Sequence, residues 1–186
     1  MKVIPINQDE NELIALAVSN NRSAQQKLYS KFSGKMLGVC RQYIKDLQLA
    51  EDVMLTGFMK VFVNLDSFEK KGSFEGWIRR IMVNECISYI RVQKKVVYSE
   101  DVFYPEENYN EIEQEFSINE IQFLIDQMPE GYKMIFNLYA IEGFKHNEIA
   151  KMLKISEGTS KSQLYHARKI LQSQITKLKN TDNGTF

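Results

Sequence analysis

Apolar residues recur at every third or fourth position along most of this 186-residue chain, and few breakers interrupt the pattern. That period places apolar side chains on one face of an α-helix, whereas a half-buried strand would alternate apolar and polar residues. Only three prolines and nine glycines are present, so long helices are expected. One such face carries Leu28, Phe32, Met36, Val39, Tyr43 and Leu47. The pattern predicts an all-α protein without β-strands.

The predicted helices form two blocks separated by a stretch without periodicity. We expect helices at residues 10–20, 24–45, 49–65 and 73–95 in the first block, and at 118–128, 130–141, 147–153 and from Glu157 onward in the second. Residues 96–117 hold Pro105 and many acidic residues, which predicts an extended linker. The tail, residues 181–186, is expected to fray. The sequence thus predicts two small helical domains, residues 1–95 and 118–180, joined by an acidic linker.

Charge is distributed unevenly, although the formal net charge is zero. Residues 1–95 carry 15 Lys and Arg against 10 Asp and Glu, residues 96–130 carry none against 10, and residues 131–186 carry 9 against 4. Salt screens electric fields beyond about 10 Å, so local charge decides what each surface attracts. Two units that bind a polyanion are one interpretation, and ordinary domains joined by a solvated linker are the other.

Other classes of function find no support in the residues. No stretch approaches the roughly 20 apolar residues of a membrane span, and the N-terminal residues lack the apolar segment of a secretory signal. Cys40 and Cys86 lie within apolar helical patterns, which favours buried thiols in a reducing cytoplasm. His146 and His166 have no Cys, Asp or Glu cluster at metal-ligand spacing, and no phosphate-binding glycine motif is present. We therefore expect a cytoplasmic protein that has no cofactor or metal and is not an enzyme.

The residues after 146 have the pattern of a helix-turn-helix. A short amphipathic helix is followed by the connection 154–156 and by a longer helix from Glu157. Ser156 is a suitable N-cap, since its hydroxyl can accept a backbone N–H that has no other partner. At Lys154, a position that often holds glycine, left-handed geometry would cost on the order of 1 kcal/mol.

The longer helix has two distinct faces. The inward face is predicted to carry Ser160, Leu164, Ala167 and Leu171, and the outward face Lys161, Ser162, Tyr165, Arg168 and Lys169. Such a helix fits the major groove, where cations neutralise phosphates and polar side chains reach base edges. Further candidate DNA contacts on this helix are Thr159, Gln163 and His166. A plain helical hairpin with solvated lysines is the alternative.

The helix predicted at 73–95 has a basic face. At 100° per residue, one face carries Arg80, Asn84, Ile87, Arg91, Lys94 and Lys95, and the other carries Trp77, Ile78, Ile81, Met82, Cys86 and Tyr89. The preceding loop, residues 68–74, is rich in Phe, Lys and Gly. Cations suit the backbone of unpaired DNA, and aromatic rings can stack on flipped bases. A solvated basic face over a bundle core, with Trp77 in that core, is the alternative.

The helix predicted at 49–65 carries apolar residues outside its core face. The core face is predicted to hold Ala50, Val53, Met54, Phe58, Val61 and Leu65. Leu55 and Met59 lie off this face, beside Asp52. Extra apolar residues of this kind can mark a partner surface or can face another helix of the bundle.

At these residues the chain resembles a bacterial sigma factor of the extracytoplasmic-function type. The matching segments are, in order, AEDVMLTGFMKVF (residues 50–62), FEGWIRRIMVNECISYIR (74–91), MPEGYKMIFNLYAIEGFKHNEIAKML (128–153) and ISEGTSKSQLYHARKIL (155–171). Their order and spacing match sigma domain two, a linker and sigma domain four, with no third domain between them. The resemblance implies a factor that binds core RNA polymerase, recognises and opens promoter DNA, and so directs transcription initiation.

The resemblance implies a role for each segment. The helix with Glu51, Asp52, Leu55 and Met59 resembles the one that docks on the clamp helices of the polymerase β′ subunit. The next helix and its loop are similar to the unit that opens the duplex and reads the minus-ten element, which implies DNA contacts at Phe68, Lys70, Lys71, Phe74, Trp77, Arg80, Asn84, Arg91, Lys94 and Lys95. The helix-turn-helix is similar to the reader of the minus-thirty-five element, in a domain that also touches the β flap. The acidic linker would thread the RNA path of the polymerase, and an anti-sigma factor is a further candidate partner.

The chain departs from the usual residues of that family at several positions. Leu55 and Thr56 stand where Gln and Glu are frequent, and Ser88 stands where Asp is frequent. Ser160 replaces a usual Val, which forfeits apolar burial of roughly 1 kcal/mol. Gln163 replaces a usual Arg, so the minus-thirty-five preference is expected to differ. A free-standing dimeric helix-turn-helix regulator and a protein-interaction bundle without a DNA role are the alternative interpretations.

Overall fold

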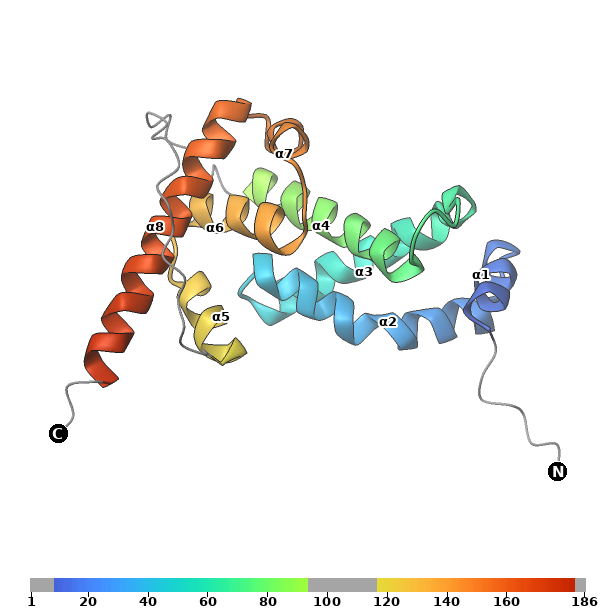
Figure 1. The fold of residues 1–186 in the computed structure, drawn as a ribbon. Helices are drawn as coiled ribbons and strands as arrows, with labels where there is room; N and C mark the ends of the chain where they lie inside the picture. Colours follow the sequence, from blue (N-terminus) through green and yellow to red (C-terminus); the bar gives the residue numbers. More distant parts are fainter. Residues whose placement is uncertain (1–8, 94–116, 183–186) are drawn as a thin grey trace. The chain divides into compact units, whose positions relative to one another are not determined.

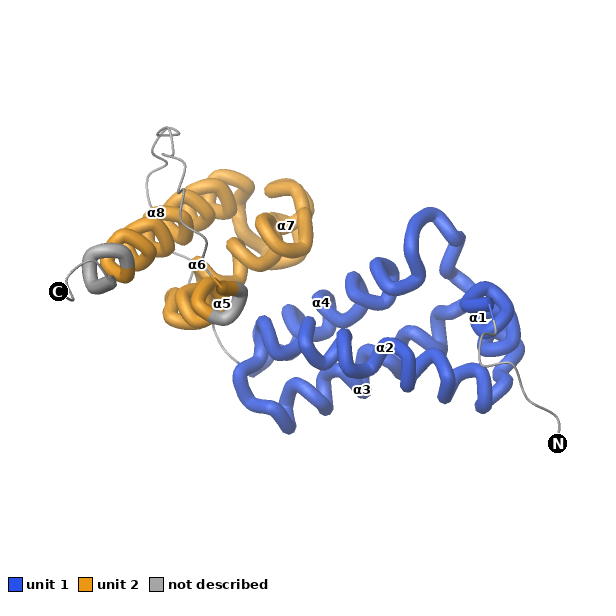
Figure 2. The backbone as a smooth tube through the Cα atoms, turned by 60° about the horizontal axis from the view of Figure 1, so that its bottom comes forward, with its two compact units in different colours: residues 1–94 blue, residues 95–186 orange. Residues whose placement is uncertain are grey.

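The computed structural model describes residues 9–93 and 117–182, and within these two stretches every regular element is helical (Figure 1). This confirms the predicted all-α class. The chain divides into two compact units, residues 1–94 and residues 95–186 (Figure 2). Most of the predicted linker, most of the predicted tail and the candidate DNA contacts Lys94 and Lys95 lie outside the described residues.

The first unit is a helical bundle. Its helices are α1 (Glu10–Val18), α2 (Arg22–Tyr43), α3 (Leu47–Val63) and α4 (Phe74–Gln93), with a short 3₁₀ turn, η1 (Leu65–Ser67), after α3. Helices α2, α3 and α4 pack against one another, and α1 packs on α2 and η1 (Figure 2). The predicted helices are thus confirmed, with ends that differ from the predicted ends by at most two residues.

Three helices of the first unit begin at a side chain that accepts a backbone N–H. Asp9 caps α1, Asn21 caps α2 with an oxygen 3.0 Å from the Ala24 nitrogen, and Asp46 caps α3. A cap of this type stabilises a helix by about 1 kcal/mol. The polar residues between apolar segments therefore determine where each helix starts.

The core of the first unit is apolar and continuous across α2, α3 and α4. It contains the full core face predicted for the helix at residues 49–65, with the last residue lying in η1: Ala50, Val53, Met54, Phe58, Val61 and Leu65. Gly57 of α3 lies against α4, because a Cβ there would be 2.3 Å from Met82 Sδ. Cys40 and Cys86 are buried free thiols, as expected. A hydrogen bond with Cys86 lowers the pKa of Cys40, while burial opposes that shift.

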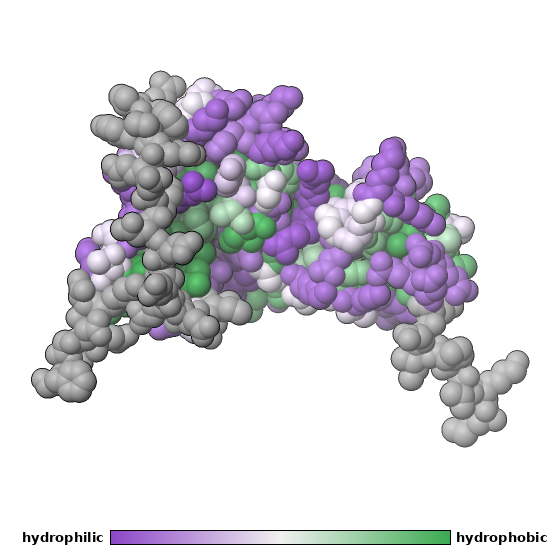
Figure 3. Space-filling model, viewed as in Figure 1, coloured by the Kyte–Doolittle hydropathy of each residue, from purple (hydrophilic) through white to green (hydrophobic). Residues whose placement is uncertain are grey.

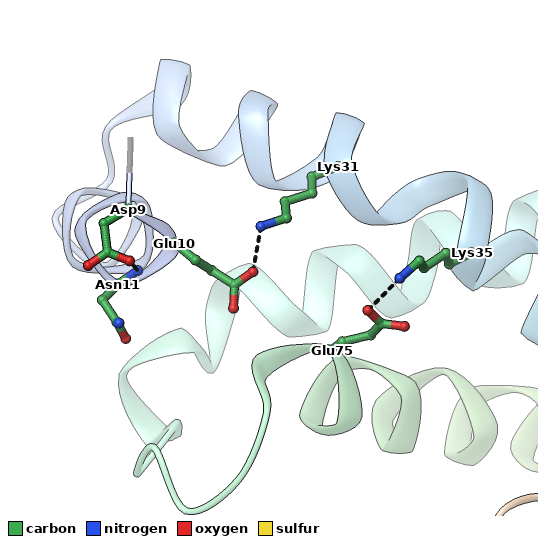
Figure 4. A network of polar contacts seen from close by, with 6 residues as sticks. All are labelled: Asp9, Glu10, Asn11, Lys31, Lys35 and Glu75. Atoms are coloured by element: carbon green, nitrogen blue, oxygen red, sulfur yellow. Dashed lines mark hydrogen bonds and ion pairs between the residues drawn. The ribbon is translucent and has the colours of Figure 1, made fainter. Parts of the chain in front are cut away.

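Ion pairs join the helices of the first unit at its surface. Lys31 Nζ lies 2.7 Å from Glu10 Oε2 and links α2 to α1, and Lys35 Nζ lies 2.7 Å from Glu75 Oε2 and links α2 to α4 (Figure 4). Exposed pairs of this kind contribute at most about 1 kcal/mol each. Apolar packing therefore contributes more to the stability of this bundle than the ion pairs do.

The second unit is built around one long helix. Its elements are α5 (Ile118–Asp126), α6 (Glu130–Phe136), the π-helical turn η2 (Asn137–Ile141), α7 (His146–Leu153) and α8 (Glu157–Asp182). Helices α5, α6 and α7 all pack on α8. One core cluster joins Ile125, Met128 and Ala167, with Tyr132, Phe136, Ile170 and Leu171 packed around it.

Hydrophilic side chains form much of the visible surface, with hydrophobic residues between them (Figure 3). None of the helices in residues 9–93 and 117–182 combines the length and apolar character that a membrane crossing requires. The same residues contain no group of three His, Cys, Asp or Glu side chains arranged to hold a metal ion.

Candidate nucleic-acid interface

Helices α7 and α8 form the helix-turn-helix that the sequence predicts. The chain leaves α7 through Lys154 in left-handed geometry, with φ 57° and ψ 46°, and the Ile155 N–H donates to the Ala150 carbonyl over 3.1 Å. Ser156 Oγ then accepts the Thr159 N–H at 2.9 Å and caps α8. The expected cap is confirmed, and the left-handed geometry of Lys154 has a cost on the order of 1 kcal/mol.

The predicted outward face of α8 is less exposed than its spacing suggested. Lys161 and Lys169 are exposed, and Arg168 and His166 are half-buried. The remaining candidates are buried, with exposed fractions of 7% for Thr159, 1% for Ser162, 1% for Gln163 and 7% for Tyr165. The expectation that Ser162 and Tyr165 point to solvent is therefore wrong. The predicted inward residues Ser160, Leu164 and Ala167 are buried, as expected.

Hydrogen bonds within the first turns of α8 satisfy two of these buried polar side chains. The Thr159 hydroxyl lies 2.8 Å from the hydroxyl of Ser156, and Ser162 Oγ donates to the Thr159 carbonyl at 3.1 Å. Hydroxyl groups can be buried at low cost when the helix itself supplies a partner. Thr159 therefore belongs to the cap of α8, where its hydroxyl supports the turn.

The cations of α8 are held by neighbouring side chains. Lys161 Nζ lies 3.0 Å from Glu157 Oε1, one helical turn earlier. Lys169 Nζ lies 4.8 Å from the ring centroid of Tyr165, which is cation–π distance. Arg168 Cζ lies 5.7 Å from the ring centroid of Tyr139 in η2. The site thus offers three positive groups along one helix, the kind of surface that contacts phosphates.

His146 is a member of this site that the sequence analysis did not place among the candidates. Its Nδ1 lies 2.9 Å from Ser160 Oγ, and its ring stacks on Tyr139 with centroids 4.5 Å apart. Burial lowers the pKa of His146, and the nearby charges of Lys161 and Arg168 lower it further, while Glu157 opposes them. The sequence did contain a signal for this contact. Ser160 was predicted to face inward, and a buried hydroxyl needs a polar partner such as His146.

The basic face of α4 is largely as predicted. Arg80, Asn84 and Arg91 are exposed along this helix. Ile87, which the helical wheel placed on the same face, is only 5% exposed and belongs to the core. An apolar side chain at the border of two faces turns toward the core when a neighbouring helix covers it.

The aromatic residues before and within α4 form one cluster. The ring centroids of Phe68 and Trp77 are 5.5 Å apart, and those of Phe74 and Trp77 are 5.8 Å apart. Phe74 is 2% exposed and packs on Phe32 of α2, whereas Phe68 and Trp77 are half-buried. Phe68 and Trp77 therefore present ring surface to solvent, while Phe74 anchors the cluster in the core.

The loop between η1 and α4 carries its charged groups outward. Lys70 is exposed and has φ 57°, and Lys71 Nζ lies 2.6 Å from Glu69 Oε2 in a largely exposed pair. The two lysines predicted to contact DNA are thus accessible to a large anionic ligand.

Helix α3 presents an apolar surface that the bundle leaves uncovered. Leu55 and Met59 are 47% and 69% exposed, and Glu51 and Asp52 are exposed beside them. The interpretation that Leu55 and Met59 face another helix of the bundle is therefore wrong within the described residues. Val63 extends the same surface at 79% exposure. Its spacing of four residues from Met59 was the signal that could have identified it.

Two family models match separate parts of the chain. Residues 28–96 match the model described as Sigma-70 region 2, and residues 118–171 match the model described as Sigma-70, region 4. The first match begins in α2 and covers α3 and α4, and the second covers the helix-turn-helix.

Curated relatives extend these matches over most of the chain. The ECF RNA polymerase sigma-E factor of Haemophilus influenzae is 25% identical over 183 residues, covering 91% of this chain and 96% of that protein. The ECF RNA polymerase sigma factor SigW of Bacillus subtilis is 27% identical over 164 residues, covering 79% of this chain and 86% of that protein. In fold, the chain is similar to the sigma factor RpoE of Bartonella quintana, solved with the anti-sigma factor NepR, with a TM-score of 0.51 at 20% identity, covering 81% and 96% of the two chains.

Proposed function

The chain belongs to the sigma-70 family of RNA polymerase sigma factors, in its extracytoplasmic-function group, and from this premise we propose how its two units divide the work of transcription initiation. As a sigma factor it binds core RNA polymerase and promoter DNA. One observation supports this division of roles between the units. The region 2 match lies almost wholly in the first unit, and the region 4 match lies in the second. Residues 1–95 then act as domain two, residues 118–180 as domain four, and residues 96–117 as the linker.

The first unit docks on polymerase through α3. The docking surface consists of Glu51, Asp52, Leu55, Met59 and Val63. Exposed apolar residues rimmed by carboxylates suit a protein partner, since burial contributes roughly 25 cal/mol per Å² of apolar surface and the charges set its orientation. We assign the β′ clamp helices as that partner.

The first unit also opens the duplex and holds the minus-ten element. The groups that carry this role are the exposed face of α4 with Arg80, Asn84 and Arg91, the half-buried rings of Phe68 and Trp77, and the loop lysines 70 and 71. Unpaired bases stack on aromatic rings with about 1–3 kcal/mol per base, while cations hold the backbone. Opening then needs no covalent step, because the unit binds the open strand better than the duplex. We therefore propose that the chain is not itself catalytic.

The second unit reads the minus-thirty-five element through α8. Lys161, Arg168 and Lys169 supply the charge that positions the helix on phosphates. Each unit alone binds weakly in this scheme, and tethering both to polymerase raises the effective concentration of the second, which strengthens binding by about 100- to 10,000-fold. The β flap is the further polymerase contact of this unit.

Two more assignments follow from these partners. The protein acts in the cytoplasm, where polymerase and promoters are. An anti-sigma factor is a candidate regulator, as the one solved with the Bartonella quintana RpoE illustrates.

Reconstituted transcription tests the proposal. The full chain and core polymerase are incubated with genomic DNA fragments, and start sites are mapped to define the promoter. At that promoter, Lys169→Ala should weaken binding of all upstream sequences about equally and reduce the slope of log affinity against log salt by about one. Lys177→Ala, on the same helix beyond the helix-turn-helix, is the matched control.

Three outcomes contradict the proposal. A chain that does not associate with core polymerase removes the sigma role. A dimer that protects duplex DNA without polymerase identifies a free-standing regulator instead. Unchanged promoter occupancy in both Arg168→Ala and Lys169→Ala removes α8 from the groove.

A further inference from the structure

Helices α7 and α8 are joined by a polar contact inside the helix-turn-helix. Nδ1 of His146, the first residue of α7, lies 2.9 Å from Oγ of Ser160. Ser160 is 0% exposed, so its hydroxyl is shielded from water. A buried hydroxyl that loses its partner destabilises the arrangement that buries it. The contact therefore favours one orientation of α7 on α8.

The ring of His146 has a second partner that leads toward the cations. It stacks on Tyr139 with centroids 4.5 Å apart and ring planes 23° apart. Tyr139 lies in the π-helical turn η2, and Arg168 Cζ lies 5.7 Å from its ring centroid. Turns of this kind are rare and occur often at functional sites. His146 is thus connected to α8 directly, through Ser160, and indirectly, through Tyr139 and Arg168.

Burial and two nearby cations favour the neutral form of His146. Burial and the cations Lys161 and Arg168 lower its pKa, against the opposing carboxylate of Glu157. A neutral imidazole has one donor and one acceptor nitrogen, so Nδ1 can pair with a hydroxyl in either role. The hydrogen bond to Ser160 therefore requires no positive charge on the ring.

We propose that His146 is a positioning residue for sequence reading by α8: its bond to Ser160 sets the angle between α7 and α8, and its stack on Tyr139 sets the place of Arg168. The inference rests on the proposed function, in which α8 reads the upstream promoter element. Recognition requires side chains within about 0.5 Å and 10–20° of the productive geometry, so a change in this angle moves all the side chains that α8 presents to DNA together.

Three variants of the full chain separate the two contacts. His146→Phe keeps a ring against Tyr139 and removes the hydrogen bond, while His146→Asn keeps an amide near the position of Nδ1 and removes the ring. Ser160→Ala removes only the hydroxyl oxygen. The matched control is Ser173→Ala, which removes an exposed hydroxyl from the same helix outside the helix-turn-helix.

Holoenzyme made from each variant is titrated with two promoters, one with the mapped upstream element and one with that element scrambled. The ratio of the two affinities measures sequence reading. Loss of one good base contact lowers such a ratio by about fivefold or more. We expect that loss for His146→Phe and for Ser160→Ala, and no further loss when the two substitutions are combined. His146→Asn should lower the ratio less. Ser173→Ala should keep the wild-type ratio.

Three results overturn the inference, and they differ from one another. If His146→Phe and Ser160→Ala show the same ratio of promoter affinities as the control Ser173→Ala, the bond between His146 and Ser160 does not position α8. If both variants weaken the two promoters equally, His146 has only a structural role. If wild-type holoenzyme itself does not distinguish the two promoters, the proposed function of α8 fails and this inference fails with it. Should His146→Phe fail to fold, Ser160→Ala decides, because it leaves the ring in place.

Discussion

The two units differ in where they keep their functional side chains. In the first unit an apolar core supports the site, and Asn84, Leu55 and Met59 all project outward from it. In the second unit Ser160 and Ser162 are buried, and a histidine bonds across the interface between two helices. Substitutions in the first unit should therefore change binding without changing the fold, whereas substitutions in the second should change stability and binding together.

The largest effect is expected for a substitution in the docking surface of the first unit. Met59→Glu places a charge in the centre of the exposed surface of α3 and should weaken binding to core polymerase on the order of 30-fold, as for a hot-spot residue worth about 2 kcal/mol. The free energy of unfolding should change by less than about 0.5 kcal/mol, because the position is exposed. Fluorescence anisotropy of the labelled chain measures the affinity for core polymerase, and a urea titration measures the free energy of unfolding.

The matched control for docking is Val18→Glu. Val18 is an exposed apolar residue at the end of α1 and is not part of the docking surface of α3. Equal losses of affinity in the two variants would show that the effect is not specific to α3.

A smaller effect is expected for promoter opening. Asn84→Ala removes an exposed amide from α4 and should reduce the fraction of open promoter complexes about fivefold, the lower end for one base contact. Its affinity for core polymerase should stay at the wild-type value. Permanganate reactivity of unpaired thymines reports the opening, and Gln26→Ala, an exposed amide on α2, is the control. Parallel losses in opening and docking would contradict the role assigned to α4.

The turn of the second unit offers a stability test. Lys154→Gly removes a side chain from left-handed geometry and should raise the free energy of unfolding of this unit by up to about 1 kcal/mol. Lys151→Gly, inside α7, should lower it by about 1 kcal/mol. Urea titrations followed at the methyl group of Ile149, a buried residue of α7, report this unit within the full chain. A loss of stability in Lys154→Gly would contradict the turn geometry.

The smallest expected effect is a pH dependence confined to the second unit. The folded state lowers the pKa of His146 from its ordinary value of about 6.5, so the unfolded chain binds a proton at higher pH than the folded one. Stability is then fully present above pH 6.5 and declines as the pH falls toward the folded pKa. The urea midpoint at Ile149 should fall between pH 7.5 and 5.5, and His146→Phe should reduce that fall. An imidazole NMR titration with a midpoint at or above the ordinary value would exclude this account.

The sequence predicted the helices of both units closely because helix formation depends mainly on residues that are near one another in the chain. Helical period located each α-helix of the described residues, and the predicted cap Ser156 marked the start of α8. On α3 the separation of the core face from Leu55 and Met59 was also correct, because only one side of that helix is covered.

The errors share one physical cause. The exposure of Ser162 and Tyr165 depends on what packs against α8, and spacing along one helix does not contain that information. Ile87 was misplaced for the same reason, since it lies at the border of two faces of α4. His146 was missed because its partner is 14 positions away, so the pair exists only after the turn brings α7 onto α8. Local pattern predicts elements, and contacts between elements decide the fine structure of the site.

Footprinting at the mapped promoter, with and without core polymerase, tests the central claim most directly. With core polymerase, the chain should protect the upstream and minus-ten elements together and make the minus-ten region reactive to permanganate. Without polymerase it should protect neither element at the same concentration. Protection of both elements by the chain alone, or of neither element by the mixture, would contradict the division of promoter recognition between two units that act on one polymerase.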